Sequence, residues 1–140
     1  MGLYLCIYAD DTDDLEIDGI EVGPYPTFTF FRNVVGNRLE VGDWGSRYPH
    51  LLQHSDCDGE WTVDELPELD VELRAIQQSM RGLPPPTNGD PWLESIHREL
   101  GLKAADLSEY FVDTDGAPLL DRLIDLVRLA RGAGRPISFE

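Results

Sequence analysis

The sequence predicts an α+β fold, in which a single domain of residues 1–140 has a mixed β-sheet with about four helices packed on it. Three observations lead to this prediction. Apolar residues alternate at two-residue spacing near both ends of the chain, which is typical of strands. Two long stretches, one central and one near the C-terminus, carry apolar residues at helical spacing. A length of 140 residues is the usual size of one domain.

The N-terminal third is predicted to contain two strands and a helix. Residues 3–8 are apolar on both alternating sets, which predicts a strand in the centre of the sheet. Residues 17–22 alternate around a glycine and predict a second strand or hairpin arm. Two prolines follow, and Thr27 is expected to cap a helix that runs to Leu39. Residues 48–53 are expected to be extended.

The clearest predicted helix follows residue 62. Thr62 and Glu65 have the spacing of a capping box, in which each side chain satisfies a free backbone amide of the other residue. An apolar stripe at helical spacing then follows, and it consists of Leu66, Leu69, Leu73, Ile76 and Met80. Gly82 and the three prolines after it are expected to end this helix.

The C-terminal part is predicted to alternate between helices and short strands. Asp90 and Pro91 provide the cap and first-turn proline of a helix that ends at Gly101. Residues 110–112 predict a short strand, residues 115–134 a long helix and residues 137–139 a closing strand. A right-handed crossover between the two strands would make them parallel, which is why we expect a mixed sheet.

The charge of the chain is strongly negative and unevenly distributed. The net charge is −16, and residues 1–73 contain 17 acidic residues against three arginines. Such a field repels phosphate backbones and attracts cationic surfaces, although acidity can also serve solubility alone. We therefore expect no direct nucleic-acid binding. Without an apolar run of roughly 20 residues or a disulfide framework, the sequence predicts a cytoplasmic protein that does not contact a membrane.

Residues 54–65 contain an unusual density of side chains that can bind metals. An EF-hand alignment places Asp56, Asp58 and Glu65 at three of the calcium-ligand positions. The first ligand position is occupied by His54, which is a poor ligand for a hard cation, and a proline interrupts the helix that should enter the loop. Helix capping explains Glu65 equally well. Calcium binding is therefore the weaker interpretation of this segment.

Zinc binding and catalysis have less support from the same segment. His54 and Cys57 could both reach one zinc ion, but the paired Cys-x-x-Cys elements of structural zinc sites are missing. The carboxylates beside Cys57 would repel a thiolate, which disfavours nucleophilic catalysis. The sequence also lacks the nucleophile-elbow, phosphate-loop and dinucleotide motifs. We expect no enzyme, catalytic residue, resident metal or cofactor, and keep a calcium- or zinc-responsive binding domain as the alternative function.

Binding through an acidic surface is the function that the residues favour. An aromatic anchor among carboxylates suits the Arg and Lys side chains of a basic partner. We expect an acidic face built from residues 10–21 and 56–72. Its candidate contact residues are Asp10, Asp11, Asp13, Asp14, Asp56, Asp58, Glu60 and Trp61. The competing interpretation of Trp61 is a side chain that packs onto the following helix.

Several segments, in order along nearly the whole chain, resemble one family of bacterial proteins. The most specific of them is His54-Ser55-Asp56-Cys57-Asp58-Gly59-Glu60-Trp61. The others are Met1-Gly2-Leu3-Tyr4-Leu5-Cys6, Ile20-Glu21-Val22-Gly23, Phe28-x-Phe30-Phe31-Arg32, Gly45-Ser46-Arg47-Tyr48-Pro49, Gly116-x-Pro118-Leu119-Leu120-x-Arg122-Leu123 and Gly134-Arg135-Pro136-Ile137-x-Phe139. Together they resemble the immunity protein 70 family of bacterial polymorphic-toxin systems.

The resemblance implies a non-catalytic protein that binds and neutralises a cognate toxin domain and so protects the cell that makes the toxin. The charge adds that this toxin domain is expected to be cationic. Nucleases that grip phosphate are the commonest cationic class, so a basic nuclease is the expected partner. The oligomeric state is not predicted by the sequence.

Overall fold

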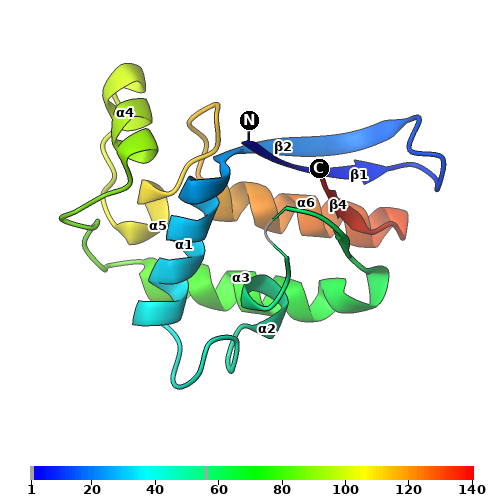
Figure 1. The fold of residues 1–140 in the computed structure, drawn as a ribbon, viewed down its shortest axis with the longest axis horizontal. Coiled ribbons are helices and arrows are strands. Elements are labelled where there is room, and N and C mark those ends of the chain that lie inside the picture. Colours follow the sequence, from blue (N-terminus) through cyan, green and yellow to red (C-terminus); the bar gives the residue numbers. More distant parts are fainter. Residues whose placement is uncertain (1, 56) are drawn as a thin grey trace.

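The computed structural model describes residues 2–55 and 57–140 (Figure 1). Its strands are β1 (Gly2–Tyr8), β2 (Glu16–Pro24), β3 (Glu60–Trp61) and β4 (Ile137–Phe139). Its four longer helices are α1 (Tyr25–Arg38), α3 (Leu66–Met80), α4 (Pro91–Leu100) and α6 (Leu119–Ala133). The short helices α2 (Pro49–Leu52) and α5 (Leu107–Tyr110) and the 3₁₀ turn η1 (Val63–Glu65) lie between them. The predicted α+β class is confirmed.

The described strands form one sheet in the order β2-β1-β4-β3, and every neighbouring pair is antiparallel. The sheet is therefore antiparallel, and the expectation of a mixed sheet was wrong. That expectation depended on a strand at 110–112 that would pair in parallel with β4. Instead, α5 ends at Tyr110, and Val112 makes only an isolated antiparallel bridge to Pro118. A three-residue apolar run does not distinguish a strand from the buried end of a helix.

The helices that build the core lie on one side of the sheet, as Figure 1 shows for α6 and α3 beneath the β1–β2 hairpin. Leu3, Leu5 and Ile7 of β1 point to that side, and each is at most 1% exposed. α6 contacts β1, β2 and β4, and α3 packs along α6. Burial of each such aliphatic side chain contributes about 1.5–3 kcal/mol, so this apolar layer supplies most of the stability.

The helical segment after residue 62 begins, and α4 begins and ends, where the sequence predicts. α6 begins at Leu119, four residues after the predicted start of its helix. The Glu65 carboxylate accepts from the Thr62 amide at 3.1 Å, which completes its half of the predicted capping box. Asp90 caps α4 through a bond from the Leu93 amide, and Gly101 ends that helix in the left-handed conformation. These signals act within one turn of the chain, so they do not depend on the rest of the fold.

Two local predictions were wrong because tertiary contacts override them. Thr27 does not cap α1, which begins at Tyr25. Its buried hydroxyl instead donates to the Asp90 carboxylate at 2.8 Å. Residues 48–53 are not extended but form α2, with Leu51 and Leu52 buried in the core. Glu72 of α3 stabilises this short helix by accepting from backbone amides of its first turn.

Candidate partner-binding face

One face of the sheet is left to the solvent. Side chains alternate between the two faces of a strand, and the residues between the buried apolar ones of β1 point away from the helices. We call this surface the open face, and its side chains are Tyr4, Cys6, Tyr8, Glu16, Glu21, Glu60, Ser138 and Glu140. The four glutamates are exposed and the two tyrosines are half-buried. Cys6 alone is fully buried, because the tyrosines flank it on the central strand.

The charged side chains of the sheet are all negative. None of the four described strands contains Lys or Arg, whereas they carry Glu16, Asp18, Glu21 and Glu60. Glu60 joins the open face because its neighbour Trp61 points into the core. The electrostatic potential over this face is therefore negative. The sequence predicts an acidic face from residues 10–21 and 56–72, but of the second segment only Glu60 belongs to the open face, because residues 66–72 lie on α3.

Two tyrosine–glutamate hydrogen bonds fix the positions of side chains on the open face. The Tyr4 hydroxyl donates to the Glu16 carboxylate at 2.7 Å, and the Tyr8 hydroxyl donates to that of Glu140 at 2.9 Å. Burial and the Glu16 bond raise the pKa of Tyr4 above its ordinary value. The hydrogen bonds to Cys6 and Glu140 raise the pKa of Tyr8 likewise. Both phenols therefore stay protonated as fixed donors, and each carboxylate keeps acceptor capacity for another molecule.

The acidic turn that connects β1 to β2 extends the negative surface beyond the sheet. Asp10 accepts from the amide and hydroxyl of Thr12, and these bonds lower the pKa of Asp10. Asp11 pairs with Arg135 at 2.9 Å, although its own side chain is 97% exposed. Asp13 adopts a left-handed backbone with φ of 58°, and Asp14 is exposed. All four predicted aspartates of this turn thus lie on the surface.

The outer edge of β2 is not available for pairing with another strand along its centre. The Gly19 carbonyl accepts from the Arg122 guanidinium at 3.2 Å, and the Glu21 carbonyl accepts from the Thr114 amide at 3.0 Å. Arg122 is itself held by the buried carboxylate of Asp113 at 3.3 Å. Because these backbone acceptors are occupied, this part of the edge cannot pair with the strand of another chain.

Trp61 does not have the surface role that its sequence suggests. It is fully buried, its ring packs edge-on against Phe139 at 4.7 Å, and its indole donates to the His50 carbonyl at 2.8 Å. The sequence places Trp61 among the contact residues because carboxylates flank it. The structure instead places Trp61 in the core, where its ring contacts are with Phe139 of β4 and with His54. Of the neighbouring predicted residues, Asp58 and Glu60 are exposed and Asp56 lies outside the described residues.

Two ligand-type side chains of residues 54–65, His54 and Glu65, hold this segment together. The two ring nitrogens of His54 lie 2.8 and 2.9 Å from the carbonyls of Ser55 and Glu60, and its ring stacks on Phe139 at 4.2 Å. Glu65 caps η1, while Cys57 is exposed. Within the described part of the chain, no three His, Cys, Asp or Glu side chains are grouped to hold a metal ion. The geometry therefore adds no support to the calcium and zinc interpretations.

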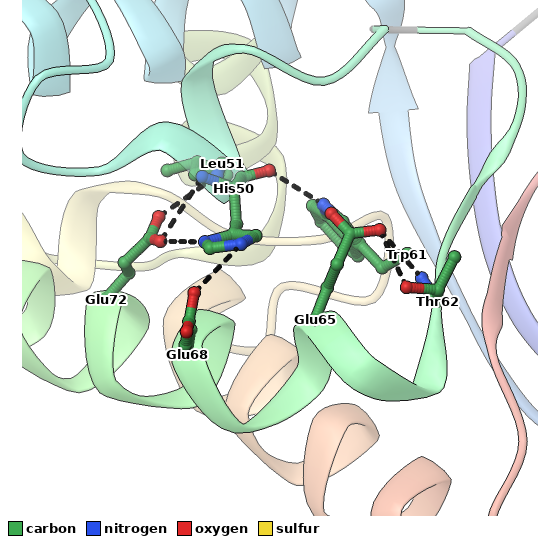
Figure 2. A network of polar contacts seen from close by, with 7 residues as sticks. All are labelled: His50, Leu51, Trp61, Thr62, Glu65, Glu68 and Glu72. Atoms are coloured by element: carbon green, nitrogen blue, oxygen red, sulfur yellow. Dashed lines mark hydrogen bonds and ion pairs between the residues drawn. The ribbon is translucent and has the colours of Figure 1, made fainter.

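A buried polar network beneath this segment was not found by sequence reasoning (Figure 2). The Glu72 carboxylate accepts from the backbone amides of His50 and Leu51 at 3.2 and 3.1 Å and lies 2.5 Å from the His50 ring. The other ring nitrogen lies 3.2 Å from the exposed Glu68 carboxylate. The signal was available, because Glu72 occupies the apolar stripe of α3 next to Leu73. A glutamate in that position must be paired if the helix is to pack.

The fold and the open face define the class of this molecule: a small α+β protein that presents an acidic sheet face to the solvent. The family described as Immunity protein 70 matches residues 3–139, and the chain belongs to this family. It is thus an immunity protein, which implies a toxin as its binding partner, and such families are generally not enzymes. A search of curated proteins and one of solved structures gave no match. None of the described helices is long and apolar enough to cross a membrane.

Proposed function

We propose that this immunity protein neutralises a cationic toxin domain in the cytoplasm by covering it with the open face and the acidic turn of residues 10–14. Family membership supports the toxin as partner, and the remaining steps follow from the charge and its placement. The open face offers fixed phenol donors and carboxylate acceptors in one layer. Arginine and lysine side chains pair well with such acceptors.

The observation that carries the proposal is that the exposed charges of the sheet have one sign. The described strands contain acidic side chains without a single basic one, and the adjoining turn adds Asp10, Asp11, Asp13 and Asp14. A surface of one sign steers a partner of the opposite sign and accelerates association, and it rejects partners of like charge. A nuclease that grips phosphate is the basic toxin class that such a surface fits best.

Charge reversal on matched positions tests this proposal. The protein is titrated with the toxin domain encoded beside it, at low and at high salt, as wild type and as Glu60→Lys combined with Asp14→Lys. Each of the two reversals changes the charge as much as Asp43→Lys, an exposed control in the loop between α1 and α2, far from the sheet (Figure 1).

We expect the double variant to lose affinity by about tenfold or more at low salt and by less at high salt, because salt screens exposed charges. Asp43→Lys is expected to bind like wild type. Equal behaviour of the two variants, or wild-type binding that is indifferent to salt, would contradict the proposal.

A further inference from the structure

A cavity opens at the end of the open face where the N-terminus of β1 meets the C-terminal end of β2. Its volume is about 360 Å³, and it is lined by residues of both strands together with one residue from α4 and one from the loop before α6. The residues that matter for its chemistry are Tyr4, Glu21, Gly23, Trp92 and Thr114. The cavity therefore continues the open face instead of forming a separate site.

The Trp92 indole forms a fixed aromatic wall of this cavity. It packs directly over Gly23, where a Cβ atom would come within 3.0 Å of the ring, and Gly23 has a φ of 121° that side chains rarely adopt. Asp90 fixes the start of α4 by accepting from both Leu93 and Thr27. The ring is thus held by the backbone of β2 and by its own capped helix, and it is half-buried.

The Glu21 carboxylate brings an unsatisfied negative charge to the same cavity. Its backbone carbonyl is occupied by the Thr114 amide, but its side chain forms no hydrogen bond or ion pair with the described residues. This distinguishes it from Glu16 and Glu140 on the same face, which each accept from a tyrosine. A lone carboxylate beside an aromatic wall is an arrangement that attracts a cation, because the ring face is also electron-rich.

We propose that this cavity receives one arginine side chain of the toxin and acts as the anchor point of the interface. The proposal rests on the proposed function, since it names the group through which the same face recognises its partner. A planar guanidinium can stack on Trp92 and donate two hydrogen bonds to Glu21, whereas an ammonium can do only one of these well. The volume of about 360 Å³ is near the lower end of the range for small-ligand pockets, so the cavity has room for one arginine side chain.

The test on the complex compares two removals with a matched control. Glu21→Gln keeps the shape of the side chain and removes its charge, and Trp92→Leu removes the aromatic wall. Glu99→Gln makes the same charge change on the exposed surface of α4, outside the cavity lining. We expect each removal to weaken toxin binding by about tenfold or more, as for an interface anchor, and the control by less than about twofold.

The second test uses the free protein and keeps the inference testable if Trp92→Leu does not fold. N-acetyl-arginine amide at millimolar concentration is expected to shift the Trp92 indole NMR signal, and N-acetyl-lysine amide is expected to shift it less. The buried Trp61 indole serves as internal control, and Glu21→Gln is expected to abolish the shift. Absence of an arginine-dependent shift in the wild type, or an unchanged shift in Glu21→Gln, would overturn the inference.

The two proposals fail in different ways. If the charge reversals at Glu60 and Asp14 weaken binding while Glu21→Gln and Trp92→Leu bind like wild type, the open face stands and the arginine cavity is wrong. If the charge reversals have no effect and the arginine probe still shifts Trp92, the cavity binds guanidinium but does not belong to a toxin interface. An arginine anchor in the toxin interface is ruled out in both cases.

Discussion

The two faces of the sheet use the same strands for opposite purposes. On the covered face of β1, Leu3, Leu5 and Ile7 are excluded from water and hold the helices. On the open face, Tyr4 and Tyr8 alternate with them and bind carboxylates at the solvent boundary. The comparison teaches that the core and the proposed recognition surface are separated by a single step in the strand, because successive side chains point to opposite sides. Substitutions on each face should therefore change different measurements.

The largest expected effect on stability comes from a substitution on the covered face. Leu5→Ala should lower the free energy of unfolding by about 3 kcal/mol, since a fully buried leucine is removed from the centre of the sheet and leaves a cavity. Glu60→Lys, on the open face, should change it by less than about 0.5 kcal/mol. Urea unfolding followed by circular dichroism measures both. Similar losses for the two variants would contradict the separation of the faces.

A smaller effect separates buried from exposed carboxylates on one helix. Glu72→Ala should lower the free energy of unfolding by about 2 kcal/mol, because it leaves the amides of His50 and Leu51 without their buried acceptor. Glu68→Ala removes the other carboxylate that contacts the same imidazole, but Glu68 is 73% exposed. Its loss should be below about 0.5 kcal/mol. A cost for Glu68→Ala as large as that of Glu72→Ala would show that the network of Figure 2 depends mainly on the imidazole.

The smallest expected effect on stability comes from a substitution on the open face, and it appears only at alkaline pH. The pKa of Tyr4 is raised in the folded state, so the unfolded chain loses this proton first as the pH passes about 10. Its stabilising contribution is complete below that pH and decreases as the pH rises further. Tyr4→Phe should therefore lose less stability than wild type between about pH 9 and about pH 11 in urea titrations. An equal pH dependence of the two proteins would show that burial and Glu16 do not raise the pKa of Tyr4 in the folded state.

Sequence reasoning succeeded where the signal is local. The capping box of Thr62 and Glu65, the Asp90 cap and the alternation of β1 each depend on residues within one turn or one strand, and all are present. It failed where a residue's partner is distant. Thr27 was expected to cap its own helix but bonds to Asp90, 63 positions away.

The candidate site shows the same division. The charges of the acidic turn and of Glu60 were predicted, because surface exposure of charged residues is the ordinary case. Trp61 was misplaced, because its carboxylate neighbours say nothing about the aromatic contact with Phe139, which comes from the other end of the chain. Trp92 and Glu21 were not singled out together, because they meet only through the packing of α4 over Gly23.

The sequence by itself determined the α+β class, most element boundaries, the negative charge and its concentration in the N-terminal half. It also carried the family resemblance that the match over residues 3–139 confirms. Only the tertiary structure decided that the sheet is antiparallel, that Trp61 belongs to the core and that one face of the sheet stays uncovered. The physical reason is that propensity, capping and charge act between neighbours in the chain. The choice of strand partners and the burial of a given side chain depend instead on contacts between distant segments, such as Leu5 and Phe139, which are 134 positions apart. No local sequence pattern contains the free energy of such contacts.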